Sequence, residues 1–367
     1  MKRKVLLFLY GPLSNSGVPQ VLLSIVKSLN KSVDFTLLVL NGGVLDEEFK
    51  KYGTQIFYMQ EKRPTAKWRR RIYDYTQRYQ SIAKQLNNFL KTNKFDAIHC
   101  CGGFDGGLYM KVAFKNKVPI RILHCHGQFP KRAHNHFKEL QKNRYRKYIE
   151  NFTTIKLTCS KKAGETYFLN TDNMITLVNS VDIESYLDIA KTVSNKIRIL
   201  QIGVYNENKN QLFSLELLKD LIKDGKEAKL TFIGYDLSSN YGKKLQSYTK
   251  ENDLNGHVKF LPSNSDKKEV FKETDVLLLP SYTEACPLVA LEAQAANIPV
   301  LASSNVPSDV DFGLCEYISL ANKEKWINSI SNIKNEKFIL REEFYNQNHK
   351  GYGEKMYKLY CGEMSDE

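Results

Sequence analysis

The sequence predicts two doubly wound α/β domains joined by a linker. Three observations support this fold class: the length of 367 residues suits two domains of ordinary size, short apolar runs alternate with helix-like segments, and the alternation restarts halfway along the chain. Strands of a parallel sheet are buried on both faces, so they read as short continuous apolar runs. We expect the two Rossmann-like domains to face each other across a cleft, with ligands bound beyond the carboxyl ends of the strands.

The first domain is expected over residues 1–185. It opens with an apolar run at 5–10, a loop rich in Gly, Ser and Asn at 11–17, and an amphipathic segment at 18–30. Further apolar runs, each predicted to be a strand, occur at 35–40, 97–99 and 120–124. This order is typical of βαβ units.

The second domain is expected over residues 196–345. Its first strand, 196–203, repeats the strand-into-glycine opening of the chain. Helices are predicted at 211–224 and from Pro287 onward, and further strands at 230–233, 258–261, 276–279 and 299–302. Residues 346–367 are expected to include a helix from 352 to 361 that crosses back to the first domain.

The composition excludes several classes of protein. Hydrophobic residues make up 42% of the chain, which excludes global disorder, and no run of 18 uncharged apolar residues occurs. The apolar run at 5–10 is too short for the core of a secretion signal. There are seven cysteines and no CxxC motif, which is typical of free thiols in a reducing compartment. We therefore expect a cytoplasmic protein.

Positive charge is concentrated in the first half of the chain. Residues 1–190 contain 31 Lys and Arg against 15 Asp and Glu, whereas residues 191–367 contain 23 against 25. This asymmetry indicates an anionic partner for the first domain: a membrane surface, a nucleic acid or a phosphorylated substrate.

Two segments that interleave cations with aromatic residues account for much of this charge. Their candidate contact residues are Lys67, Trp68, Arg69, Arg70, Arg71, Arg144, Arg146 and Lys147. Such a composition is typical of interfacial helices on anionic lipid, although single-stranded nucleic acid or a merely solvated helix face would also accept it. We predict peripheral contact with the inner face of a membrane and no nucleic-acid partner.

The strongest local pattern lies at residues 280–293, PSYTEACPLVALEA. Glu284 lies in a predicted strand-to-helix loop and Glu292 inside the helix, about 12 Å further on at 1.5 Å per residue. The free N–H groups between them suit a sugar diphosphate. One carboxylate would then bind hydroxyls of a sugar and the other a ribose. The spacing alone equally fits a helix-dipole partner and a solvated glutamate.

This pattern resembles the E-x7-E signature of retaining glycosyltransferases of family 4, which have the GT-B fold. Residues 258–302 are similar to that family in the segments VKFL, TDVLLLPS, EACPLVALEAQA and IPVLAS. The resemblance implies that Glu284 contacts the donor sugar and stabilises an oxocarbenium-like transition state, and that Glu292 binds the nucleotide ribose. It also implies donor contacts by the backbone N–H groups of Cys286, Leu288 and Val289.

Other donor-side residues are weaker matches to the same family. The loop at 203–210 resembles its G-R-x-x-x-x-K element, in which both cations bind the diphosphate; Lys209 matches, but Val204 stands where arginine is expected. The resemblance assigns His126 to the donor sugar, and three glycines are assigned to the donor side: Gly17, Gly203 and Gly234.

We predict no metal site and no required cofactor. Residues of zinc-binding type do occur, at His99, Cys100, His124, Cys125, His134 and His136, but their spacings match no usual ligand pattern. Lys209 and helix N–H groups would instead neutralise the leaving diphosphate.

The expected function is transfer of a sugar, with retention, from a nucleotide diphosphate sugar to a glycan or lipid-linked acceptor in surface polysaccharide synthesis. UDP is the expected nucleotide because it is frequent in the family. Two alternatives stay open. One is a non-catalytic GT-B subunit that binds or stabilises a glycosyltransferase, which Val204 favours. The other is a UDP-sugar epimerase, which needs no acceptor.

Overall fold

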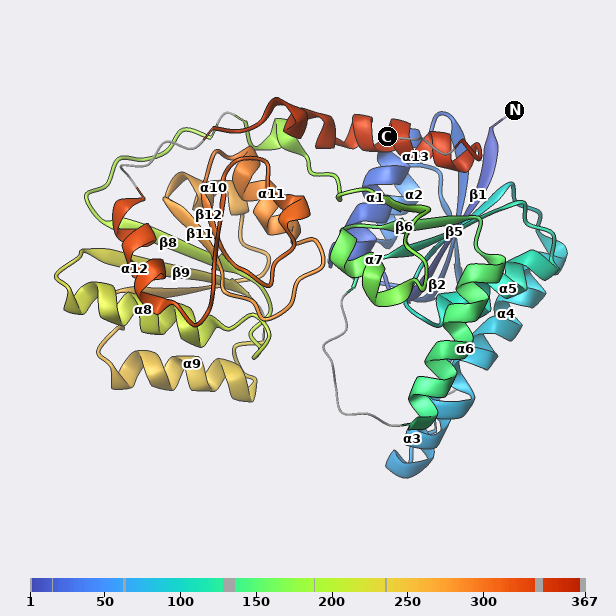
Figure 1. Ribbon diagram of the computed structural model, residues 1–367, viewed down its shortest axis with the longest axis horizontal. Helices are drawn as coiled ribbons and strands as arrows, with labels where there is room; N and C mark the ends of the chain where they lie inside the picture. The colour runs from blue at the N-terminus through green and yellow to red at the C-terminus, as the bar shows by residue number, and fades with distance from the viewer. Residues whose placement is uncertain are drawn as a thin grey trace. The chain divides into compact units, whose positions relative to one another are not determined.

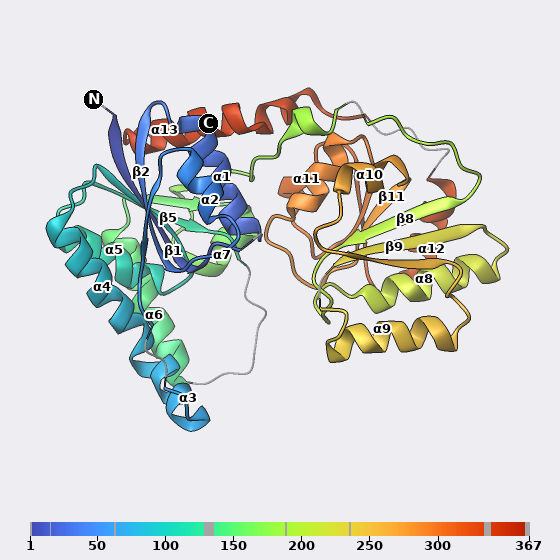
Figure 2. The same ribbon diagram turned by 180° about the vertical axis from the view of Figure 1, so that it is seen from behind.

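The computed structural model describes residues 2–14, 16–61, 64–127, 136–187, 189–234, 236–333 and 339–363. Within these ranges, the side chains of residues 71, 72, 74–76 and 136–138 lie outside the description. The chain divides into two compact units. Unit 1 comprises Met1–Ser180 and His349–Glu367, and unit 2 comprises Val181–Asn348. Each has a parallel sheet covered by helices, as predicted (Figures 1 and 2).

The sheet of unit 1 has, among the described residues, seven strands in the order β3-β2-β1-β4-β5-β6-β7. In that order the strands are Gln55–Tyr58, Val33–Asn41, Arg3–Pro12, Ala97–Cys101, Ile120–Cys125, Ile155–Thr158 and Met174–Thr176. Every neighbouring pair is parallel. The chain starts in the middle of the sheet, winds to one edge, and returns to β4. This is the doubly wound topology, in which ligands bind at the carboxyl edge near the reversal.

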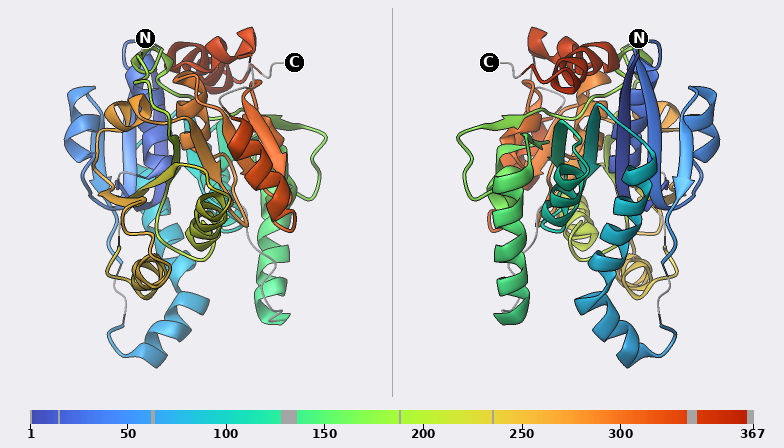
Figure 3. Two further views of the ribbon diagram at one scale, coloured as in Figure 1. Left: turned by 90° about the vertical axis from the view of Figure 1, so that its left-hand side faces the viewer. Right: turned by 90° about the vertical axis from the view of Figure 1, so that its right-hand side faces the viewer.

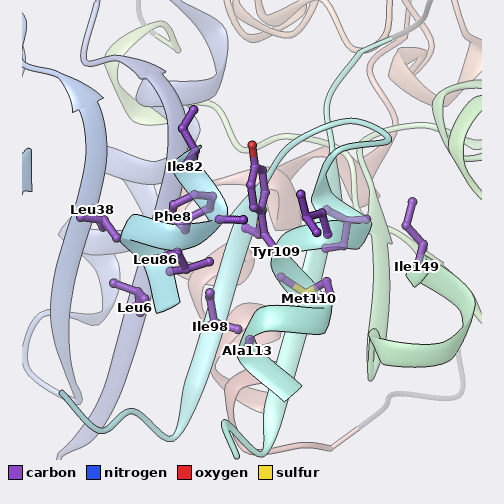
Figure 4. Close-up of a cluster of buried hydrophobic side chains, with 14 of the residues drawn as sticks. Leu6, Phe8, Leu38, Ile82, Leu86, Ile98, Tyr109, Met110, Ala113 and Ile149 are labelled. Atoms are coloured by element: carbon purple, nitrogen blue, oxygen red, sulfur yellow. The ribbon is translucent and has the colours of Figure 1, made fainter. Parts of the chain in front are cut away.

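Helices cover both faces of this sheet. They are α1 (Gly17–Leu29), α2 (Asp46–Lys51), α3 (Lys67–Thr76), α4 (Arg78–Thr92), α5 (Gly106–Lys115), α6 (His136–Phe152) and α7 (Lys161–Tyr167). The core beneath α4 and α5 is fully buried, and the rings of Phe8 and Tyr109 meet edge-on with centroids 4.9 Å apart (Figure 4). α3, which directly precedes α4 in the chain, extends beyond the sheet. The start of α6 extends beyond the sheet on the same side (Figures 1 and 3).

The last helix, α13 (His349–Tyr360), belongs to unit 1 and packs against α1. The contact requires a residue without a side chain, because a Cβ at Gly353 would lie 2.3 Å from Ser28 Oγ. Tyr360, at the end of α13, is fully buried, and its hydroxyl is 2.8 Å from His99 Nδ1 in the middle of the sheet. The chain therefore completes the core of unit 1 only after it has passed through unit 2.

The sheet of unit 2 has, in the described part of the chain, six parallel strands in the order β10-β9-β8-β11-β12-β13. In that order they are Val258–Pro262, Ala228–Gly234, Ile197–Ile202, Val276–Leu279, Val300–Ser303 and Cys315–Ile318. Its helices are α8 (Gln211–Lys223), α9 (Asn240–Glu251), α10 (Lys267–Lys272), α11 (Leu288–Ala295) and α12 (Lys323–Asn332). Short 3-10 turns lie at Ile183–Ser185, Ser308–Val310 and Glu342–Gln347. Trp326 is fully buried in the core.

Some boundaries differ from the sequence-based expectation. β1 extends to Pro12 rather than ending at residue 10, and Gly17 is the first residue of α1 rather than part of the loop. Pro287 is the N-cap of α11 and not part of its first turn, since its ψ of 107° is extended. Among the described residues, no helix has both the length and the apolar character needed to cross a bilayer.

Candidate functional site

The site in unit 2 is built around an ion pair between Glu284 and Lys209. Glu284 lies in the loop between β11 and α11, and Lys209 in the loop between β8 and α8, so both are at the carboxyl ends of neighbouring central strands. Lys209 Nζ is 2.5 Å from Glu284 Oε1, and the Ser281 hydroxyl donates to the same oxygen at 2.7 Å. The Lys209 and Glu284 side chains are 22% and 10% exposed, so the pair is mostly shielded from water.

Three hydrogen bonds tie the two loops together and so fix the separation of the paired residues. The Tyr282 N–H donates to the carbonyl of Asn208 at 2.9 Å, and the Asn208 side-chain amide donates to the carbonyl of Thr283 at 2.8 Å. The amide of Asn210 donates to the carbonyl of Pro280 at 3.2 Å. Asn210 has φ +55°, in the left-handed region that asparagine adopts more readily than most residues.

A buried chain of polar groups holds the backbone of Lys209. The Gln201 amide on β8 donates to the Lys209 carbonyl at 2.7 Å, and Ser214 on α8 donates to Gln201 Oε1 at 2.8 Å. Gln201 and Ser214 are both buried, where an unmade hydrogen bond would be costly. The lysine therefore projects from a rigid position, with only its side chain able to change partner.

Glu292, on α11, is held by a lysine that the sequence analysis did not single out. Lys267, the first residue of α10, places its Nζ 2.6 Å and 2.7 Å from the two carboxylate oxygens. The Glu292 side chain is 14% exposed. Burial, together with the negative charge of Glu292, raises the pKa of Tyr186 well above its usual value, so this hydroxyl stays protonated beside the carboxylate. Glu292 is thus not the freely solvated helix residue that its spacing also allowed.

The start of α11 lies between the two glutamates in the sequence. Leu288 and Val289 are its first two residues, so their N–H groups precede the first intrahelical hydrogen bond. Cys286 lies just before Pro287 and is a partly exposed free thiol. Because the helix begins only at Leu288, the rise of 1.5 Å per residue applies to just the second half of the spacing between the glutamates.

The glycines of unit 2 allow the backbone to pack closely beneath the site. A Cβ at Gly234 would lie 2.5 Å from the Gly203 carbonyl oxygen and 2.7 Å from the ring of Tyr205. Gly203 lies directly against the aliphatic stem of Lys209. Val204, where the resemblance predicts arginine, has a carbonyl that accepts from the Gln211 amide at 2.9 Å, so this loop is ordered without a cation.

In unit 1, His126 directly follows β5 and is half-buried. Its Nε2 is 3.6 Å from Cys101 Sγ, and its ring contacts the His124 ring at an angle of 39°, with centroids 3.7 Å apart. Burial lowers the pKa of His126 to about 3, so the ring is neutral at neutral pH. Gly17 is exposed at the start of α1, and a Cβ there would meet nothing within 4 Å. Nothing in the packing of unit 1 requires glycine at that position.

The basic residues of unit 1 are placed differently from one another. The exposed ones are Lys67, Arg69, Arg70, Arg144 and Lys147, and Trp68 is 63% exposed with Arg69 over its ring. Two of these also donate hydrogen bonds within unit 1: Arg70 to the carbonyls of Pro64 and Thr65, and Arg144 to the Tyr148 hydroxyl. Arg146 instead turns inward, donating to the Thr166 carbonyl at 2.6 Å and lying over the Phe104 ring. The side chains of Arg71 and His136, and residue His134, are outside the described residues.

The geometry of unit 2 is that of an anion-binding and hydroxyl-binding site. It has two carboxylates to accept hydroxyl donors, a lysine ammonium beside each, and a helix N-terminus between them in the sequence.

Comparison with known proteins shows that the part of the chain that forms this site matches a protein family. Residues 182–327, which include both glutamates and both lysines, match the family described as Glycosyl transferases group 1. Unit 2 is a glycosyl transferases group 1 domain. With its two parallel-sheet α/β domains, the chain has the GT-B fold.

Individual relatives extend over most of the chain. The capsular polysaccharide biosynthesis glycosyltransferase CapH of Staphylococcus aureus is 24% identical, covering 81% of this chain and 80% of CapH. The UDP-Gal:alpha-D-GlcNAc-diphosphoundecaprenol alpha-1,3-galactosyltransferase of Escherichia coli is 23% identical over 69% of this chain and 70% of its own. The solved structure of Anabaena HepE in complex with UDP superposes with a TM-score of 0.70 at 12% identity, covering 98% and 95% of the two chains.

Proposed function

We propose that this glycosyltransferase moves a sugar, with retention, from a UDP-sugar to a lipid-linked or glycan acceptor in the assembly of a surface polysaccharide. The observation that carries the proposal is the pairing of Glu284 with Lys209 and of Glu292 with Lys267 in one group 1 domain. The names of CapH and of the diphosphoundecaprenol galactosyltransferase support the acceptor class, and the UDP complex of HepE supports the nucleotide.

In this reaction the bond between the anomeric carbon and the diphosphate breaks, and negative charge collects on the leaving phosphate oxygens. Lys209 would turn from Glu284 to that diphosphate, and the N–H groups of Leu288 and Val289 would add donors at the helix terminus. Glu284, once released, would stabilise positive charge on the sugar ring. The acceptor hydroxyl forms the new bond on the face from which the diphosphate leaves, and its proton passes to the leaving diphosphate oxygen. These residues supply the charge stabilisation, so we propose that no metal takes part in transfer.

Glu292 is proposed to bind the ribose. Two carboxylate oxygens can accept from two neighbouring hydroxyls, and Lys267 holds the carboxylate in one orientation until the nucleotide arrives. Lys267 also restores a second cation to a site that has Val204 where the resemblance predicts arginine. In unit 1, His126 is proposed to contact the donor sugar, as a neutral imidazole.

Thermal stabilisation by ligands tests the donor site. We expect UDP and UDP-sugars, but not adenine or guanine nucleotides, to raise the melting temperature of the full-length protein, since any ligand that prefers the folded state stabilises it. Glu292→Gln should weaken the shift. A matched control is Glu269→Gln on α10, which removes an exposed glutamate that is likewise paired with a lysine. Absence of a shift with every nucleotide would refute the donor site and favour the non-catalytic subunit.

Turnover tests the chemistry. Glu284→Gln should lower the rate of acceptor-dependent UDP release by about 10²–10³-fold, the usual cost of removing one group that stabilises transition-state charge. Binding of UDP should change much less. If the wild type instead converts a UDP-sugar to an epimer without an acceptor, the proposal is wrong and the epimerase alternative holds.

We also propose that unit 1 contacts an anionic membrane surface through the exposed cations of α3 and α6. The triple substitution of Lys67, Arg69 and Arg70 by Gln should abolish sedimentation with phosphatidylglycerol vesicles, because each basic residue near such a surface contributes about 1 kcal/mol. The same charge loss at three exposed lysines of α9, Lys243, Lys244 and Lys250, is the control. Equal loss of binding in both triple variants would show only a non-specific charge effect and refute this surface.

A further inference from the structure

Unit 1 contains a cluster of three histidines and one cysteine at the carboxyl ends of β4 and β5. His99 and Cys101 are two apart on β4, and His124 and His126 are two apart at the end of β5, so each pair faces one side of the sheet. The two strands are neighbours with Cys101 opposite His124. All four side chains therefore meet on one face.

The distances within the cluster suit coordination of one metal ion. His99 Nε2 is 3.0 Å from His124 Nδ1, and Cys101 Sγ is 3.9 Å from His99 Nε2 and 3.6 Å from His126 Nε2. One ligand atom from each of His99, Cys101 and His124 lies within 4.8 Å of the other two. Tetrahedral zinc bonds imply about 3.3 Å between two nitrogens and about 3.6 Å between sulfur and nitrogen.

The surroundings of the cluster match those of metal ligands in one further respect. His99 Nδ1 is 2.8 Å from the Tyr360 hydroxyl, so the nitrogen that points away from the cluster has the outer partner that orients a ligating imidazole.

Binding would form the metal–sulfur bond and release the proton of the Cys101 thiol to water, so affinity should fall as the pH is lowered.

We propose that His99, Cys101 and His124 bind a divalent transition metal ion, with Zn²⁺ as the ion that best suits a mixed nitrogen and thiolate set. His126, half-buried where the strand ends, lies beside this cluster. Sequence spacing did not indicate this site, because the ligands alternate on two strands that only sheet pairing brings together. The metal has no role in the proposed transfer step.

Metal binding to the full-length protein is the test. Protein stripped with a chelator and kept reduced should bind one equivalent of Zn²⁺, and its melting temperature should rise with added Zn²⁺. Co²⁺ in place of Zn²⁺ should give the intense thiolate-to-cobalt charge-transfer absorption of a sulfur-ligated ion. Cys101→Ser should remove that absorption. Cys100→Ser, also a buried cysteine of β4 but pointing to the opposite face, should keep it.

X-ray absorption at the zinc edge keeps the proposal testable if Cys101→Ser fails to fold. The wild-type protein should show one sulfur at about 2.3 Å and nitrogens at about 2.0–2.1 Å. A first shell without sulfur would overturn the proposal. So would a cobalt spectrum that survives in Cys101→Ser and disappears in Cys286→Ser, because the ion would then sit at a surface thiol of unit 2.

Discussion

The ion pair between Lys209 and Glu284 allows a quantitative prediction about stability. Lys209→Met leaves the Glu284 carboxylate with only the Ser281 hydroxyl, and Glu284→Gln leaves the lysine ammonium without its anion. In the double variant neither residue carries a charge that has lost its partner. The double variant should therefore lose less stability than the sum of the two single variants.

The magnitude follows from how far the pair is shielded from water. Exposed ion pairs contribute about 0.2–1 kcal/mol. Removing one partner of a fully buried pair costs about 3–5 kcal/mol. With side-chain exposures of 22% and 10%, this pair lies between these limits. We expect each single substitution to cost about 1.5–3 kcal/mol and the coupling free energy to be about 1–2 kcal/mol.

Urea unfolding followed by tryptophan fluorescence measures these quantities. The chain has two tryptophans: Trp326 is buried in unit 2, and Trp68 is exposed in unit 1, so a Trp68→Phe background makes the signal report unit 2 alone. The same cycle on the exposed pair Lys272 and Glu269 should give a coupling of only about 0.3–0.5 kcal/mol. Effects of Lys209→Met and Glu284→Gln that add to within about 0.5 kcal/mol would refute the reasoning.

Three further predictions follow from close packing and from burial. Gly234→Ala should destabilise unit 2 by about 1–3 kcal/mol, since its Cβ would lie 2.5 Å from the Gly203 carbonyl oxygen; an unchanged urea midpoint would contradict this. Gly353→Val should separate α13 from α1, where a Cβ already lies 2.3 Å from Ser28 Oγ, and limited proteolysis should then cleave the C-terminal segment; resistance equal to wild type would show that the helices adjust. Burial raises the pKa of Asp105 above its usual 3.8, so in the folded state this carboxyl opposes stability as pH rises through its raised pKa. Asp105→Asn should therefore be more stable than wild type at pH 7 and equally stable below about pH 3.8, and a difference that does not depend on pH would refute this assignment.

Much of the fold was predictable because its central strands are continuous apolar runs. The middle residues of β1 and most residues of β2 and β8 are buried, as is the whole of β11, and their apolar sequences reflect this. β3, an edge strand of four residues with none fully buried, was missed for the opposite reason. Local sequence cannot distinguish such a strand from a loop, because its place is set by pairing with β2.

The candidate site was predictable only in part, for a similar reason. Glu284 and Lys209 follow strands, and Glu292 lies inside the helix that begins shortly after β11, so a local pattern carries information about their positions. Lys267 pairs with Glu292 across 25 residues, and no feature around it distinguishes it from other surface lysines. His99 and His124 likewise meet only through the pairing of β4 with β5. Contacts between residues on different helices or strands were therefore the part of the site that could not be predicted from the sequence.

The return of α13 to unit 1 has a consequence for synthesis on the ribosome. The strands of unit 1 emerge first, yet His99 and the surface of α1 lack their partners on α13 until the whole of unit 2 has been translated. At about 5–20 residues per second, this delay is on the order of ten to thirty seconds. During that time apolar surface on α1 is uncovered. The unit that is synthesised first is thus the last to complete its packing. A nascent chain halted within unit 2 would still expose the apolar surface of α1, and we expect chaperones to bind it.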